Sequence, residues 1–285
     1  MYLKIANQVI EVVGELQYVR DFFYDFRISD ENIKEDIRWE IVLGELEVPT
    51  SARVLFKNGY YEIFEEENFY YTIYPGYSYC FATITNLTNG NAKIFVSDNT
   101  NGKALEDLQC NFSFVLRDIF WARLRQINMV AIHSSTIIYN DKAYMFSGLS
   151  GTGKTTHTNM WCDSYNVDIL DGDMCICSVE AGKVYAYGSP WCGSSGKYLN
   201  KKVELGGIIF LHQAKSNYIE EMEYTNRVIN LYCRNFITPM KEKDLSKIIE
   251  IAKIIAEECM CVELYNLPQI EAVQLIKNRI DNHVA

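Results

Sequence analysis

The sequence predicts an α/β protein with a phosphate-binding loop in its core and a β-rich region before that core. Three observations support this prediction. Runs of β-branched and aromatic residues, joined by tight-turn dipeptides, fill the first hundred residues. A glycine-rich stretch ending in Lys-Thr then stands between a strand pattern and a helix pattern. After this stretch, short apolar runs alternate with segments that have the periodicity of a helix. We therefore expect a β-rich N-terminal region over residues 1–103 and an α/β core over residues 104–285.

The composition is that of a folded protein and excludes several function classes. The 285 residues include 27 Lys plus Arg and 37 Asp plus Glu, which gives a net charge of −10. Such an acidic chain disfavours wholesale binding to nucleic acid or to an anionic membrane. We find neither an apolar stretch that could span a membrane nor a signal-peptide pattern. The nine cysteines show no disulfide spacing, which predicts a cytoplasmic location.

The β-rich region is predicted to be an antiparallel meander followed by a helix. Asn58-Gly59 and Asn89-Gly90 are dipeptides that favour tight hairpins between strands. From Ala104 to Ile127, apolar residues recur every three or four positions, which predicts a long helix with one buried face. The strand patterns of the meander cover residues 52–56, 60–64, 69–74, 79–85 and 92–96.

The core is predicted to mix strands and helices, beginning with a hairpin that runs straight into the glycine-rich stretch. The expected strands cover residues 130–139, 142–147, 167–170, 174–179, 184–187, 207–211 and 261–264. The expected helices cover residues 154–161, 220–234 and 244–258, with a last helix from residue 268.

The stretch from Gly148 to Thr155 fills every position of the phosphate-binding pattern G-x-x-x-x-G-K-[ST]. Its glycines permit positive φ, so backbone N–H groups face inward and bind phosphate oxygens at the N-terminus of the next helix. Lys154 then reaches the terminal phosphates, and the Thr155 hydroxyl holds Mg²⁺. The expected cofactors are ATP, or another purine triphosphate, and Mg²⁺. The expected nucleotide-binding residues are Gly148, Ser150, Gly151, Thr152, Gly153, Lys154, Thr155 and Thr156.

Two further positions are candidates for the chemistry. Asp171 and Asp173 follow a short apolar strand, where phosphoryl transfer needs a second anchor for Mg²⁺. His133 lies on the strand paired with the one that enters the loop, so the hairpin brings it near the base of the loop. The alternatives are an ordinary Asp-Gly-Asp turn and a structural histidine. The candidate catalytic residues are therefore His133, Lys154, Asp171 and Asp173, and the candidate metal ligands are Thr155 and Asp173.

These motifs resemble the HPr kinase/phosphorylase and phosphoenolpyruvate carboxykinase superfamily, in particular its HPr-kinase-related branch. The resemblance rests on His133-Ser-Ser, the loop from Gly148 to Thr156, and Ile169 to Asp173. It implies an HPr-kinase/carboxykinase-like P-loop core with a mixed sheet and nucleotide phosphates at the loop. It also implies metal at Thr155 and Asp173, and a His133 that positions or deprotonates an acceptor hydroxyl.

The chain departs from the pattern of that family in two places. The acidic pair of the family is usually Asp-Asp, whereas here Gly172 stands before Asp173 and Asp171 lies one place earlier. This leaves open which carboxylate is the base. The Glu-x-Arg-Gly segment of true HPr kinase/phosphorylases is absent from the sequence, so phosphorolysis and the HPr substrate are not implied.

The sequence therefore predicts an ATP- and Mg²⁺-dependent kinase of the HPr-kinase-related type, whose acceptor is a Ser or Thr hydroxyl of a protein or peptide. A kinase of a small hydroxylic metabolite is one alternative. A nucleotide-binding regulatory or scaffold protein without transfer activity is another, and Gly172 favours it. A homo-oligomer is compatible with the sequence, which does not decide the oligomeric state.

Overall fold

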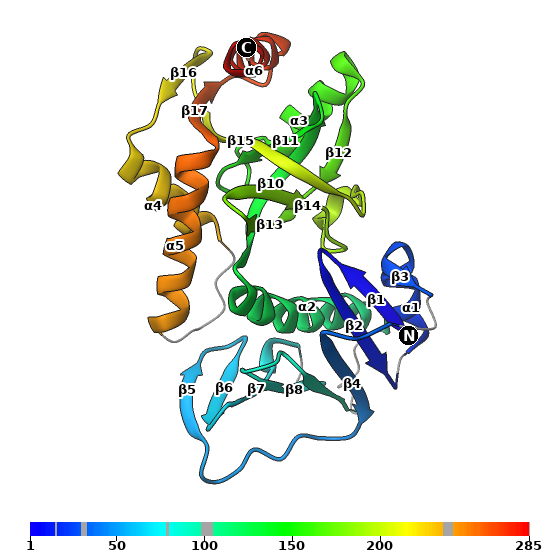
Figure 1. Cartoon of the computed structure of the whole chain (residues 1–285). Helices are drawn as coiled ribbons and strands as arrows, with labels where there is room; N and C mark the ends of the chain where they lie inside the picture. The colour runs from blue at the N-terminus through cyan, green and yellow to red at the C-terminus, as the bar shows by residue number, and fades with distance from the viewer. Residues whose placement is uncertain (15, 30–32, 78–79, 98–104, 236–241, 285) are drawn as a thin grey trace. The chain divides into compact units, whose positions relative to one another are not determined.

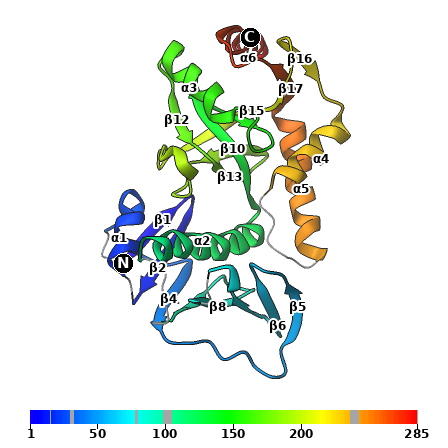
Figure 2. The same cartoon turned by 180° about the vertical axis from the view of Figure 1, so that it is seen from behind.

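The computed structural model divides the chain into two compact units, Met1–Ile127 and Asn128–Ala285. It describes residues 1–14, 16–29, 33–77, 80–97, 105–235 and 242–284. Residue 79, the first of the strand expected over 79–85, and residue 104, the first of the helix expected over 104–127, lie outside these ranges. Each unit is built on its own sheet (Figures 1 and 2). The chain is α/β with mixed sheets and a β-rich N-terminal part. Among the described helices, none has the length and apolarity needed to cross a lipid bilayer.

The first unit contains a nine-stranded sheet in the order β3-β1-β2-β4-β9-β8-β7-β6-β5. The predicted antiparallel meander is confirmed, because β5 to β9 pair in sequence order. The meander is extended by two parallel pairings, β4 with β9 and β2 with β4. The hairpin dipeptides in the sequence did not indicate these two pairings. The strands are β1 (Tyr2–Ile5), β2 (Gln8–Val13), β3 (Arg27–Ile28), β4 (Ile37–Leu43), β5 (Arg53–Lys57), β6 (Glu62–Glu66), β7 (Phe69–Ile73), β8 (Phe81–Asn86) and β9 (Ala92–Val96). Helix α1 (Gln17–Phe22) lies between β2 and β3 in the chain.

Helix α2 (Leu105–Leu124) packs against this sheet. Phe112 stacks on Phe81 of β8 with ring centroids 5.3 Å apart, and Phe120 contacts Trp39 of β4 edge-on at 6.3 Å. All four rings are buried. The expected boundary at residue 103 assigned this helix to the α/β core, but its buried face belongs to the β-rich sheet. The division of the chain therefore falls at Ile127.

Helix α2 also buries a carboxyl group, which makes the stability of the first unit depend on pH. The Asp118 carboxylate accepts a hydrogen bond from the Arg117 guanidinium at 3.3 Å. Burial raises the pKa of Asp118 to about 6, although Arg117 acts to lower it. Between these two pKa values, 3.8 when unfolded and about 6 when folded, the folded state keeps a proton that the unfolded state has lost. The contribution of Asp118 to the free energy of unfolding is therefore fully present below pH 3.8 and is lost as the pH rises through about 6.

We expect Asp118→Asn to remove this pH dependence. Between pH 4.5 and 7, the free energy of unfolding of the wild-type first unit should fall by about 2 kcal/mol more than that of the variant. Urea unfolding at the two pH values, followed by tryptophan fluorescence, measures this difference. Equal pH dependence in the two proteins would show that Asp118 is ionised in the folded state at pH 4.5.

The second unit contains an eight-stranded sheet in the order β11-β10-β13-β14-β15-β17-β16, with β12 paired to β10. β11 pairs with both β10 and β15, so β10, β11, β13, β14 and β15 form a closed ring of pairings. β17 continues the sheet in parallel with β15. The strands are β10 (Met129–Tyr139), β11 (Lys142–Ser147), β12 (Asp168–Asp171), β13 (Met174–Glu180), β14 (Lys183–Tyr187), β15 (Lys202–Gln213), β16 (Tyr218–Glu221) and β17 (Met260–Asn266).

The helices of this unit pack in two groups, each with its own hydrophobic cluster. Ile251 and Ile255 of α5 belong to a cluster with β10, whereas Trp161 of α3 and Val273 of α6 belong to one with β11 and β17. The helix expected over residues 220–234 begins later than predicted, because residues 218–221 pair with β17 as β16. The helices are α3 (Lys154–Tyr165), α4 (Tyr224–Arg234), α5 (Glu242–Glu258) and α6 (Ile270–Val284).

Candidate functional site

The glycine-rich loop joins β11 to α3, in the order strand, loop, helix that the sequence predicts. β11 ends at Ser147 and α3 begins at Lys154. Gly151 and Gly153 have backbone φ angles of +82° and +97°, which residues with a side chain rarely adopt. A Cβ added at either position would meet nothing within 4 Å, so the backbone at these two positions lies next to open space.

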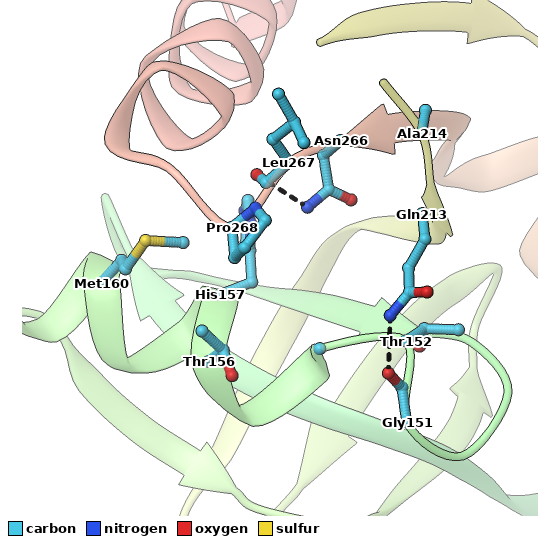
Figure 3. Close-up of a pocket in the computed structure, with 11 residues that line it drawn as sticks. Gly151, Thr152, Thr156, His157, Met160, Gln213, Ala214, Asn266, Leu267 and Pro268 are labelled. Atoms are coloured by element: carbon cyan, nitrogen blue, oxygen red, sulfur yellow. Dashed lines mark hydrogen bonds between the residues drawn. The ribbon is translucent and has the colours of Figure 1, made fainter. Parts of the chain in front are cut away.

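Other loop residues hold the loop on the end of the sheet. A Cβ at Gly148 would lie 2.6 Å from Thr152 Oγ1 and 3.0 Å from the Leu211 carbonyl oxygen, so the close approach of β15 requires glycine there. The Gln213 side-chain amide donates a hydrogen bond to the Gly151 carbonyl oxygen at 3.0 Å (Figure 3). The remaining expected loop residues, Ser150, Thr155 and Thr156, are exposed.

Lys154 lies back over its own loop. Its Nζ donates to the carbonyl oxygens of Gly148 at 3.2 Å and Leu149 at 3.5 Å. Burial lowers the pKa of Lys154, the Asp173 carboxylate raises it, and the Arg234 guanidinium lowers it. The charges of these three side chains are therefore close enough to interact across the base of the loop.

His133 and Asp173 form a pair beside the loop. His133 Nε2 lies 3.1 Å from Asp173 Oδ1, and both side chains are 37% exposed. Backbone pairing fixes this arrangement: the Ser134 N–H donates to the Asp173 carbonyl oxygen at 2.9 Å, and His133 stands opposite Met174 in the register of β10 and β13. A histidine next to a solvent-accessible carboxylate can take up a proton from a hydroxyl group that approaches it.

Asp171 differs from Asp173 in its surroundings, because it is completely buried. Its Oδ1 accepts hydrogen bonds from the N–H groups of Asp173 at 2.8 Å and Met174 at 2.7 Å. Its Oδ2 accepts one from the Ser189 N–H at 2.8 Å. Burial raises the pKa of Asp171 to about 7, while these hydrogen bonds act to lower it. The two aspartates that the sequence does not distinguish are thus separated by exposure: Asp171 orders the turn and Asp173 faces solvent.

The loop over residues 188–197 packs on this turn and explains Gly172. A Cβ at position 172 would lie 1.8 Å from Ser195 Oγ and 2.9 Å from the Cys192 carbonyl oxygen. An Asp-Asp pair at 172 and 173 would therefore require this loop to move. Lys197, the last residue of the loop, donates to Asn159 Oδ1 of α3 at 3.0 Å.

Arg234 is a charged residue of this site that sequence reasoning missed. It is the last residue of α4, and the next residue, Asn235, forms a β-bridge with Ile132, the neighbour of His133 on β10. The Arg234 Nε is buried and has no hydrogen-bond partner among the residues that the structure describes. No motif or spacing marks this position, because only the tertiary bridge brings the end of α4 to the loop.

A cavity of about 380 Å³ lies beside the glycine-rich loop (Figure 3). The loop and α3 form one side, and the segments at the ends of β15 and β17 form the other. Sequence reasoning identified the loop side of this cavity but not the strand ends, which join it through the parallel pairing of β15 with β17. The lining residues are Gly151, Thr152, Gly153, Thr156, His157, Met160, Gln213, Ala214, Asn266, Leu267 and Pro268.

Comparisons with known proteins find a structural likeness but no match of sequence. No family model matches the sequence, and no curated protein matches it. Among solved structures, the Hpr(Ser) kinase/phosphatase from Coxiella burnetii is similar to this chain with a TM-score of 0.31 and 9% identity, over 54% of this chain and 99% of that chain. This likeness is weak and partial, so support for a function comes from the site itself.

Proposed function

We propose that this protein is a Mg²⁺-dependent kinase that transfers the terminal phosphoryl group of a purine nucleoside triphosphate, namely ATP, to a hydroxyl group. The observation that carries the proposal is the meeting of three features at one place: a glycine-rich loop with an open backbone, the two cations Lys154 and Arg234, and the pair of His133 with Asp173. Backbone N–H groups at the N-terminus of a helix are well suited to phosphate oxygens.

The two cations suit the charge of the reacting group. Phosphoryl transfer spreads negative charge over the oxygens of the transferred group, and cations held in place beforehand stabilise that charge. Lys154 exchanges its contacts with the Gly148 and Leu149 carbonyl oxygens for phosphate oxygens. The buried Nε of Arg234 is an N–H donor to which a phosphate oxygen can bind.

Thr155 and Asp173 are the proposed ligands of Mg²⁺, whose charge offsets that of the phosphates. In the part of the chain that the structure describes, no group of three or more His, Cys, Asp or Glu side chains is placed to hold a metal ion. This suits Mg²⁺ in a nucleotide site, because the ion binds there through one or two protein side chains, with phosphate oxygens and water as its other ligands. A hydroxyl group and a partly exposed carboxylate meet that need.

His133, oriented by Asp173, takes the proton of the acceptor hydroxyl while the hydroxyl oxygen bonds to the terminal phosphorus of ATP and the bond from that phosphorus to the leaving ADP oxygen breaks. Asp171 acts as a positioning residue, since its hydrogen bonds hold the turn that presents Asp173. The pair is open to solvent, which suits a Ser or Thr side chain carried by a protein or peptide in the cytoplasm. A small hydroxylic metabolite is the alternative acceptor.

Incubation of the protein with γ-labelled ATP and Mg²⁺ tests the proposal. One set of reactions contains a library of Ser- and Thr-containing peptides, and a second set contains free serine and other small hydroxylic compounds. We expect ADP to form together with label in an acceptor of one set. The absence of ADP and of labelled product in both sets would contradict the kinase proposal.

A nucleotide-binding scaffold without transfer activity is the second candidate. It is favoured by the presence of a single accessible carboxylate, Asp173, at this turn, because Asp171 is buried and position 172 is glycine. This candidate predicts saturable binding of MgATP without ADP formation. Turnover of ATP with any acceptor would exclude it.

A further inference from the structure

We propose that the cavity beside the loop is the nucleobase site and that it selects adenine over guanine through the side-chain amide of Asn266. This inference rests on the proposed function and names the base that the site takes. The cavity starts at Gly151 and Thr156, residues next to the expected phosphates, and continues to the segments at the ends of β15 and β17 (Figure 3). Its volume of about 380 Å³ lies within the usual range of small-molecule sites.

Asn266 lines this cavity and carries an unpaired acceptor. It is the last residue of β17 and is 7% exposed. Its Nδ2 donates to the Leu267 carbonyl oxygen at 3.2 Å, which fixes the direction of the amide. Its Oδ1 is buried and has no hydrogen-bond partner within the described ranges. Burying an acceptor without a donor is unfavourable, so the geometry indicates that a ligand or water supplies one.

The backbone around Asn266 is held firmly, so its amide is placed before a ligand arrives. The Ala214 N–H donates to the Asn266 carbonyl oxygen at 3.2 Å. The Leu267 N–H donates to Asn217 Oδ1 at 2.7 Å. A preorganised acceptor discriminates between ligands better than a mobile one, because it cannot turn away from a mismatched partner.

The other walls of the cavity suit an uncharged aromatic ring. Met160 and Pro268 provide apolar surface. His157 is 1% exposed, and in the described part of the chain neither of its ring nitrogens has a hydrogen-bond partner. Burial also lowers the pKa of His157 to about 3, so the ring is neutral at physiological pH. This wall of the cavity thus carries no charge at physiological pH, which suits a base better than a phosphate.

The position of the acceptor distinguishes the two purines. Adenine carries an amino group at ring position 6, which donates a hydrogen bond, whereas guanine carries a carbonyl oxygen there, which accepts one. With adenine in the cavity, the amino group donates to Asn266 Oδ1. With guanine in the same pose, two acceptor oxygens face each other, and Asn266 stays unpaired.

Equilibrium dialysis of the full chain against MgATP, MgGTP and magnesium tripolyphosphate tests this inference. We expect the wild type to bind ATP about tenfold more tightly than GTP. Asn266→Ala should weaken ATP binding about tenfold and leave GTP and tripolyphosphate binding unchanged. Ala214→Trp fills the cavity from the β15 side, so it should reduce ATP binding to the level of tripolyphosphate. Asn230→Ala, on α4, is the matched control and should change none of the three affinities.

The outcomes separate the base site from the proposed function. If tripolyphosphate binds but ATP has the same affinity in the wild type, Asn266→Ala and Ala214→Trp, the base site is overturned while phosphate binding at the loop stands. A preference for GTP in the wild type also overturns the assignment of adenine. If none of the three ligands binds to the wild type, the proposed function falls together with this inference.

Discussion

Replacing Asp173 with asparagine is expected to lower the rate of phosphoryl transfer about a thousandfold while leaving the fold intact. Asparagine keeps the size of the side chain but lacks the negative charge that orients His133 and offsets the positive charge His133 gains with the proton; His133 Nε2 lies 3.1 Å from Asp173 Oδ1. The backbone of the turn is held by Asp171, which the substitution does not change. Transfer of label from γ-labelled ATP measures the rate, and thermal unfolding verifies the fold.

Asp168→Asn is the matched control for this variant. Asp168 is an exposed aspartate at the start of β12, whereas Asp173 follows the end of this strand. Replacing Asp168 removes the same charge and should preserve the rate. His133→Ala should lose activity to a similar degree as Asp173→Asn, since the two side chains act as a pair. An Asp173→Asn enzyme with more than about a tenth of the wild-type rate would contradict the role given to this carboxylate.

Lys154→Ala is expected to weaken MgATP binding about 10 to 100-fold, the usual effect of removing a charge-assisted hydrogen bond. Stability should change little, because the ammonium group contacts only carbonyl oxygens of its own loop among the hydrogen bonds described for it. Equilibrium dialysis gives the affinity, and thermal unfolding gives the stability.

Lys197→Ala is the control for the lysine substitution. Lys197 is exposed, donates to Asn159 of α3, the helix that begins at Lys154, and carries the same charge as Lys154. Its loss should therefore leave ATP affinity unchanged. If Lys154→Ala bound ATP as tightly as the wild type, the lysine would not contact the phosphates. A general effect of net charge would instead weaken binding in both variants.

The glycine-rich loop could be predicted from the sequence because its determinants are local. Within a few residues, Gly151 and Gly153 supply the positive φ values and Lys154 follows at the start of a helix. The boundary of the first unit could not be predicted in the same way. The period of α2 shows that one face is buried, but not that Phe112 and Phe120 bury it against the β-rich sheet.

The roles within the site depend on contacts between distant segments. Asp171 and Asp173 are equivalent by position, and the difference between them comes from the Ser189 N–H and the loop that follows it. Arg234 reaches the site through the bridge of Asn235 with β10, and Asn266 through the pairing of β17 with β15. Sequence spacing carries no information on such contacts.

Calorimetric titration of the full chain with MgATP tests the central claim most directly, namely that the backbone of the loop from Gly151 and the ammonium group of Lys154 hold the triphosphate of a nucleotide. We predict saturable heat at one nucleotide per chain for the wild type and a much weaker signal for Lys154→Ala. The absence of heat with ATP, GTP and tripolyphosphate, in a wild-type protein shown to be folded, would contradict the claim.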